Sequence, residues 1–180
     1  MKKILIVLAV FACFVTTSFG QTGRIPQRNE LVQIENEEQD LCLEVFNMPD
    51  DGGQSHYFLS VGHLGIGDDI IQFNIDPLSE LFIRLGDTLS DAMDKLKEMQ
   101  ELYKGSPESS IEVEGSLAIA FPKDNYEPVK VTYHKMLLSR VLEFSVERDG
   151  YIRATHIPRT DFGSVVTSLK LYQKMHPKEK

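Results

Sequence analysis

Residues 141–155 read Val-Leu-Glu-Phe-Ser-Val-Glu-Arg-Asp-Gly-Tyr-Ile-Arg-Ala-Thr, two alternating runs joined by an Asp-Gly pair. Alternation of apolar and polar residues is typical of a strand with one buried face. The pair Asp149-Gly150 suits the two-residue turn of a β-hairpin. The stretch therefore predicts an antiparallel hairpin, and with it a fold that contains antiparallel sheet.

Two other segments have the periodicity of amphipathic helices. Over residues 88–104 the apolar side chains recur every three or four positions, which places them on one face of a helix. Asp87 suits the N-cap of this helix, and Gly105 is a stop signal after it. A second helix is predicted to begin near Thr160 or Asp161. Its apolar stripe comprises Phe162, Val165, Val166, Leu169 and Tyr172.

The segment between residues 70 and 87 has two interpretations. Residues 70–75 and 81–85 read like strands, joined through residues 76–80, and predict a hairpin. Pro77 also suits the first position of a helix. Whether residues 77–87 form strand or helix therefore stays open.

The order of predicted elements occurs twice along the chain. About four strands and one helix occupy residues 30–104, and the same order returns over residues 110–176. One unit has a single helix to cover its apolar sheet face, so the two units are expected to merge their apolar faces. The predicted fold class is α+β, with antiparallel sheets in two tandem units (β4-α-β4-α) packed as one domain over residues 30–176. Residues 70–76 match 141–147 in character, so internal duplication is one explanation of this order.

This order resembles that of the Whirly class of single-stranded nucleic-acid binders. The resemblance is topological, covers the chain after its N-terminal segment in outline, and involves no shared motif. It implies binding of a single nucleic-acid strand on a sheet face. A net negative charge and predicted export argue against transferring that function, because acidic proteins repel the phosphate backbone.

The N-terminus has the order of a bacterial-type secretory signal. A Met-Lys-Lys end precedes the apolar residues 4–15, and small and polar residues follow up to Gly20. We predict that residues 1–20 are a signal peptide cleaved between Gly20 and Gln21. Residues 21–29 are then a flexible leader.

The apolar run also decides the relation to the membrane. Its twelve residues are too few to cross about 30 Å of hydrocarbon at about 1.5 Å per residue, so we predict no transmembrane segment. A lipoprotein with an acylated Cys13 is an alternative, but Phe11 fits that motif poorly. The chain is predicted to be exported, to the periplasm or out of the cell.

Charge is divided unequally along the chain. From Glu30 to Pro128 there are 5 basic and 22 acidic residues, whereas Val129 to Lys180 holds 10 basic and 5 acidic residues. The acidic total repels nucleic acid and anionic membranes. The basic second half is suited to an acidic partner, although solvated faces would explain the same distribution.

Residues suited to catalysis are few. Cys42 is the one cysteine left after signal removal, and its place in an alternating strand predicts a buried thiol. His63 near Asp68 and Asp69 is the best cluster for acid–base chemistry, but these residues alone set no geometry. The histidines lack the close spacing of a zinc site, and we predict no metal and no cofactor.

These observations favour an exported, non-enzymatic binding domain whose ligand is unidentified. The hypothesis is an acidic protein or polymer partner recognised by the basic second half. The residues proposed for it are Lys130, Arg140, Arg148, Arg153 and Arg159. One alternative is a small exported hydrolase that uses acidic residues with His63. A second alternative, by topology alone, is a single-stranded nucleic-acid binder.

Overall fold

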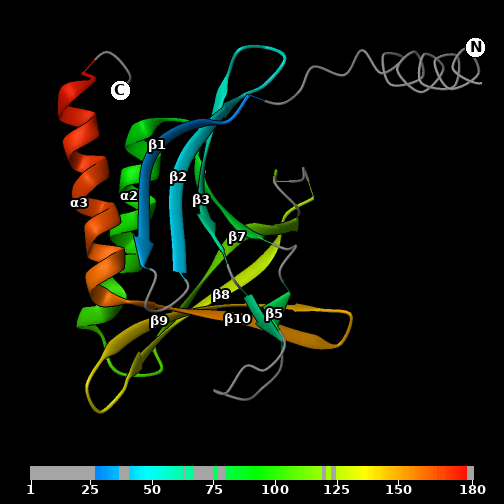
Figure 1. Cartoon of the computed structure of the whole chain (residues 1–180), viewed down its shortest axis with the longest axis vertical. Helices are drawn as coiled ribbons and strands as arrows, with labels where there is room; N and C mark the ends of the chain where they lie inside the picture. The colour runs from blue at the N-terminus through cyan, green and yellow to red at the C-terminus, as the bar shows by residue number, and fades with distance from the viewer. Residues whose placement is uncertain are drawn as a thin grey trace, which may run out of the picture.

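The hairpin predicted from residues 141–155 is present. The structure is a computed structural model that describes residues 27–36, 41–62, 64–66, 75–76, 80–118, 121–122 and 125–177 (Figure 1). Strands β9 (Arg140–Arg148) and β10 (Tyr151–Pro158) pair along their whole length. Asp149 and Gly150 have φ angles of 57° and 75°. Two successive positive φ values give the turn whose twist matches that of the flanking strands.

All strands of the described residues belong to one antiparallel sheet. Their order across it is β1-β2-β3-β6-β7-β8-β9-β10-β4-β5, of which β4 and β5 are short. The remaining bounds are β1 (Asn29–Asn36), β2 (Leu41–Pro49), β3 (Ser55–Val61), β4 (Leu64–Ile66), β5 (Ile75–Asp76), β6 (Glu80–Gly86), β7 (Ser110–Ala118) and β8 (Glu127–Lys135).

The prediction of two tandem units, each of four strands and a helix, is wrong. Strand β6 of the first half pairs directly with β7 of the second, with Glu80 opposite Ala118 and Ile83 opposite Gly115. The halves join edge to edge in one curled sheet, not face to face. This join pairs backbone groups that two separate sheets would leave as free edges. The fold is predominantly β, with two α-helices in the described part of the chain.

The predicted hairpin of residues 70–75 and 81–85 is also not formed. Residues 70–74 lie outside the described residues, but Ile75 pairs with Gly65 of β4, not with β6. Strand β6 lies between β3 and β7 instead. The alternative of a helix over residues 77–87 is wrong for Glu80–Gly86, because these residues form β6. Alternation showed which residues are strand-like but not which strands pair.

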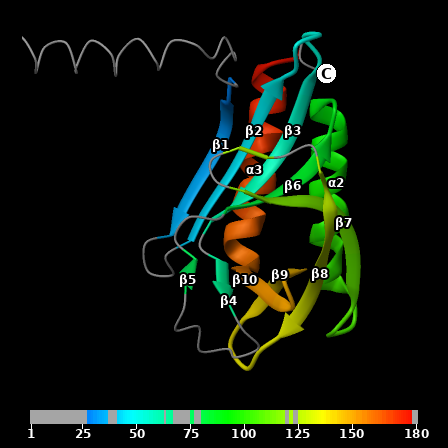
Figure 2. The ribbon, with the colours of Figure 1, turned by 90° about the vertical axis from the view of Figure 1, so that its right-hand side faces the viewer.

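Both predicted helices are confirmed. Helix α2 spans Leu89–Glu101 and continues as the short 3-10 helix η2 (Leu102–Lys104), and α3 spans Arg159–Met175. The helices contact each other and lie on the same side of the sheet (Figures 1 and 2).

The N-cap of α2 is Thr88, not Asp87 as predicted. The Thr88 hydroxyl accepts a hydrogen bond from the Asp91 amide, and the Asp91 carboxylate accepts one from the Thr88 amide, each 3.1 Å long. This reciprocal capping box satisfies two free amides of the first turn. The Asp87 carboxylate is instead engaged by His56 and Arg84, each at 2.7 Å.

The main core lies between the helices and one face of the sheet. Leu96 of α2 and Phe162 of α3 are fully buried there, together with Leu59, Ile83 and Phe144 from the strands. Helix α3 contacts β1 and β2 near one end of the sheet and β9 and β10 near the other. The sheet therefore curls around the helices.

A smaller apolar cluster lies on the opposite face of β2, β3 and β6. The Phe46 ring centroid is 5.6 Å from that of Phe58 and 5.9 Å from that of Phe82. The Arg28 guanidinium lies 4.2 Å from the Phe46 centroid and forms an ion pair with Glu44. Arg28, which the sequence assigns to the leader, thus contacts the sheet.

Candidate interaction surface

The five basic residues proposed for partner binding do not lie in one place. Arg140 begins β9 and Arg159 begins α3, at the same end of the sheet, because Pro158 pairs with Val141. Arg148 lies at the other end of β9, about 26 Å along the strand at about 3.3 Å per residue.

The basic residues at the far end have backbone partners. Arg148 donates to the carbonyl oxygen of Leu117 at 3.1 Å, and Arg153 donates to that of Arg148 at 3.4 Å. Both side chains thereby connect strands of the curled sheet. Lys130 is exposed in the middle of β8, opposite Ser145 of β9. Arg140 and Arg159 are therefore the two of the five that the structure brings together.

The turn between β8 and β9 is the most apolar exposed feature of the described residues. The Met136 amide donates to the Ser139 carbonyl at 2.9 Å, which leaves Leu137 and Leu138 at the corners of a tight turn. Leu137 is 98% exposed and Leu138 is 96% exposed. Single exposed leucines are ordinary on protein surfaces, but here two adjacent leucines both lack the favourable free energy that burial would provide.

The backbone of this turn does not require leucine. Among the described residues other than glycine, positive φ occurs at Glu108 and Asp149 and at neither leucine. Corner positions of turns favour glycine, asparagine, aspartate and proline, which set φ or bond the local backbone. The leucines therefore have no evident role in forming the turn.

Three cations lie close to the two leucines. Lys135 pairs with Arg140 immediately behind the turn, and Arg159 lies beside them. All three side chains are exposed. Within the described residues, neither Lys135 nor Arg140 has a carboxylate within 4.0 Å. We term Lys135, Leu137, Leu138, Arg140 and Arg159 the tip patch.

The turn between β8 and β9, which carries the tip patch, projects from the end of the sheet where α3 begins (Figures 1 and 2). A groove of about 550 Å³ separates the turn from the first residues of α3. Its walls include Met136, Pro158 and Thr160 besides the tip patch. The sequence interpretation identified Arg140 and Arg159 but missed Lys135 and the leucines. The missed signal is the run Lys-Met-Leu-Leu-Ser-Arg at residues 135–140, which joins two strands without any turn-forming Gly, Asn, Asp or Pro.

A histidine–glutamate array lies on the outer face of β8, β9 and β10. Glu143 Oε2 is 3.1 Å from His156 Nε2 and 3.3 Å from His134 Nε2. His134 Nδ1 is 3.0 Å from Glu108 Oε1. The hydrogen bond from His156 is the main cause that holds the pKa of the Glu143 carboxyl below its ordinary value. Within the described residues, no group of three or more His, Cys, Asp and Glu side chains is arranged to hold a metal ion.

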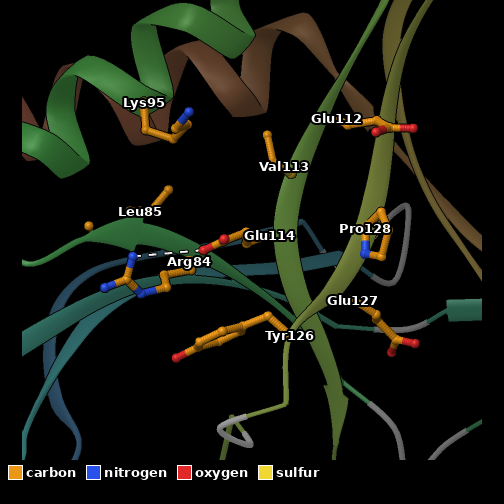
Figure 3. Close-up of a pocket in the computed structure, with 10 residues that line it drawn as sticks. Arg84, Leu85, Lys95, Glu112, Val113, Glu114, Tyr126, Glu127 and Pro128 are labelled. Atoms are coloured by element: carbon orange, nitrogen blue, oxygen red, sulfur yellow. Dashed lines mark ion pairs between the residues drawn. The ribbon is translucent and has the colours of Figure 1, made fainter.

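A second concave feature is a wedge between β6 and β7. The two strands pair only as far as Ile83 and Gly115 and then separate. The resulting pocket has a volume of about 620 Å³ and is lined by Arg84, Val113 and Lys95 among others (Figure 3).

The charged groups of this wedge engage one another. Arg84 lies 2.7 Å from Asp87 and 3.8 Å from Glu114, and its guanidinium is 5.8 Å from the Tyr126 ring centroid. Lys95 forms an ion pair with Glu98 at 2.7 Å. A ligand would have to replace these contacts, so the wedge is a weaker candidate than the tip patch.

The structure adds no support for the catalytic candidates. His63, Asp68 and Asp69 all lie outside the described residues. Cys42 is half-buried on β2, not buried as predicted, and desolvation raises the pKa of its thiol. A raised pKa leaves little of the reactive thiolate at neutral pH.

The described residues form a curled antiparallel sheet with two α-helices against one face, and comparison with known proteins finds no relative of the chain. No family model, no curated protein and no solved structure matches it. No helix in the described part of the chain is both long and apolar enough to cross a membrane.

Proposed function

We propose that this protein is an exported, non-enzymatic binding protein that recognises an acidic partner through the tip patch. The observation that carries the proposal is that two almost fully exposed leucines lie at one projecting turn, next to Lys135 and Arg140. Neither of these two cations has a carboxylate within 4.0 Å in the described part of the chain. The free energy falls when a partner covers apolar side chains at such a site, because they are removed from water. The cations favour a partner of opposite sign.

Charge asymmetry supports the same reading. The segment from Glu30 to Pro128 carries 17 more acidic than basic residues, whereas Val129 to Lys180 carries 5 more basic than acidic ones. The acidic part of the chain disfavours other orientations toward an acidic partner, because like charges repel. Binding through the tip patch is the orientation that keeps opposite charges together.

The experiment is salt-dependent retention on immobilised poly-L-glutamate, a probe of acidic partners. We expect the protein to be retained at low salt and released as salt rises, because ion pairs at a surface are screened. The variant Lys135→Gln/Arg140→Gln should elute at clearly lower salt. The control Lys170→Gln/Lys174→Gln removes the same charge from exposed sites on α3 and should elute like the wild type.

Two results would contradict the proposal. One is failure of the wild-type protein to bind the resin at low salt. The other is an equal loss of retention in the tip and control variants, because retention would then depend on net charge and not on the tip patch.

A further inference from the structure

We propose that the tip patch docks on an anionic lipid bilayer, with Leu137 and Leu138 inserted among the lipids. This inference rests on the proposed function and names the acidic partner. It follows from the order in which the tip patch presents its side chains.

The leucines lie at the outermost point of the turn, and the cations lie further back toward the sheet. Leu137 and Leu138 are the outermost residues of the turn, the hydrogen-bonded Met136 and Ser139 lie behind them, and Lys135 and Arg140 form the next pair. A bilayer has the matching order, with acyl chains below and phosphate groups above. Long cationic side chains hold their charge at the phosphate level while apolar neighbours go deeper.

The shape of the tip also fits a bilayer. The turn is narrow and convex, and its two corner residues are 98% and 96% exposed. A convex apolar tip needs a preformed pocket on a protein partner, whereas lipids rearrange around it. Lys135, Arg140 and Arg159 supply the local positive charge that attracts anionic headgroups.

The acidic remainder of the chain does not prevent this approach. Repulsion between exposed charges is screened over about 8 Å at physiological ionic strength. Asp161, the acidic residue in the first turn of α3, accepts a hydrogen bond from Asn36 at 2.9 Å. A carboxylate held in this way by β1 is not free to turn toward the lysine and arginine of the tip.

The experiment uses protein exported and processed by the expression host, with its N-terminus determined by mass spectrometry. Vesicles contain either phosphatidylcholine alone or phosphatidylcholine with about one third phosphatidylglycerol, an anionic lipid. We expect flotation with the anionic vesicles, weakened by salt. The variant Leu137→Ser/Leu138→Ser should bind at least about tenfold less tightly, because each leucine contributes a substantial transfer free energy. Leu171→Ser, at an exposed leucine of α3, is the matched control and should bind like the wild type.

Insertion has a separate optical readout. The sequence contains no tryptophan, so Leu138→Trp places a single indole at the tip. Its emission should shift to the blue with anionic vesicles, and that of Leu171→Trp should not. An unchanged Leu138→Trp spectrum on bound vesicles would overturn insertion.

The outcomes separate the two proposals. Retention on poly-L-glutamate without flotation on anionic vesicles would overturn the bilayer as partner and leave the proposed function standing. Failure on both probes would overturn both. Flotation that survives Leu137→Ser/Leu138→Ser would also overturn the inference, and these exposed positions can be changed without disturbing the core.

Discussion

Glu143 connects three neighbouring strands through side-chain contacts on the outer face of the sheet. It lies on β9, and its carboxylate contacts His134 of β8 and His156 of β10. The pKa of the Glu143 carboxyl is lowered, first by the hydrogen bond from His156, against the opposing effect of desolvation. The ionised carboxylate therefore stabilises the folded state relative to the unfolded state.

We predict that Glu143→Gln lowers the free energy of unfolding by about 1 kcal/mol at pH 7. The folded-state pKa lies below the ordinary glutamate value of 4.5. The contribution is thus complete above that value and is lost as the pH falls through the folded-state pKa. Urea denaturation followed by far-UV circular dichroism, from pH 7 down to pH ~3, measures the difference between the two proteins.

The exposed Glu112 on β7 provides the control. Glu112→Gln should leave both the stability and its pH dependence close to those of the wild type. If the gap between wild type and Glu143→Gln stayed constant from neutral to acid pH, the ionised carboxylate would not be its source.

At the scale of elements, prediction from sequence succeeded where the signal is local. The 3.6-residue period located α2 and α3, and Asp149-Gly150 located the β9–β10 turn. It failed where the deciding contact is distant. Leu81, Ile83 and Leu85 are strand-like in any arrangement, and nothing in their pattern says that β3 and β7 flank them. The N-cap of α2 was missed although its signal is local, because Thr88 and Asp91, three residues apart, form the capping box.

The candidate site shows the same division. Counting charges found the basic second half and thus Arg140 and Arg159, but not that Arg148 and Arg153 bond to backbone carbonyls. Leu137 and Leu138 look like ordinary core residues in the sequence. Only their position at the corners of a turn shows that nothing in the described part of the chain covers them.

Helix α3 contains a glycine that the fold does not need. Gly163 lies in the first half of α3, and a Cβ there would have Gln100 Nε2 as its nearest contact, at 3.9 Å. Glycine inside a helix costs conformational entropy relative to alanine. We predict that Gly163→Ala raises the free energy of unfolding by about 0.5–1 kcal/mol, measured by urea denaturation.

Gly115 gives the opposite sign and serves as the matched comparison. It lies on β7 at the last pair before the wedge, where a Cβ would come 2.6 Å from Val129 Cγ2 and 2.9 Å from the Phe82 carbonyl oxygen. Gly115→Ala should destabilise by about 1–3 kcal/mol, as overpacking does. Equal effects of the two substitutions would contradict the packing described for β7 and α3.

At the scale of the whole molecule, one helix packs against strands near both ends of the curled sheet. Helix α3 contacts β1 and β10, which are separated by six strands in the sheet order. The sequence predicted a shared core but placed it between two stacked units, because a helix stripe shows that a face is buried and not against which strands. The curl depends on the pairing of β6 with β7, which makes the sheet continuous across both halves of the chain.

Phe162 is the largest fully buried side chain that α3 contributes to the core. It is fully buried, and its ring centroid lies 6.3 Å from those of both Tyr103 and Phe144. We predict that Phe162→Ala lowers the free energy of unfolding by about 3–5 kcal/mol, through lost burial and the cavity left behind. A domain stable by about 5–15 kcal/mol loses much of its margin by such a change. Leu171→Ala, on the exposed side of the same helix, should stay within about 0.5 kcal/mol of the wild type in urea denaturation. A loss of less than about 1 kcal/mol in Phe162→Ala would mean that the strands keep their curl without the helix, and that the closure lies in the sheet itself.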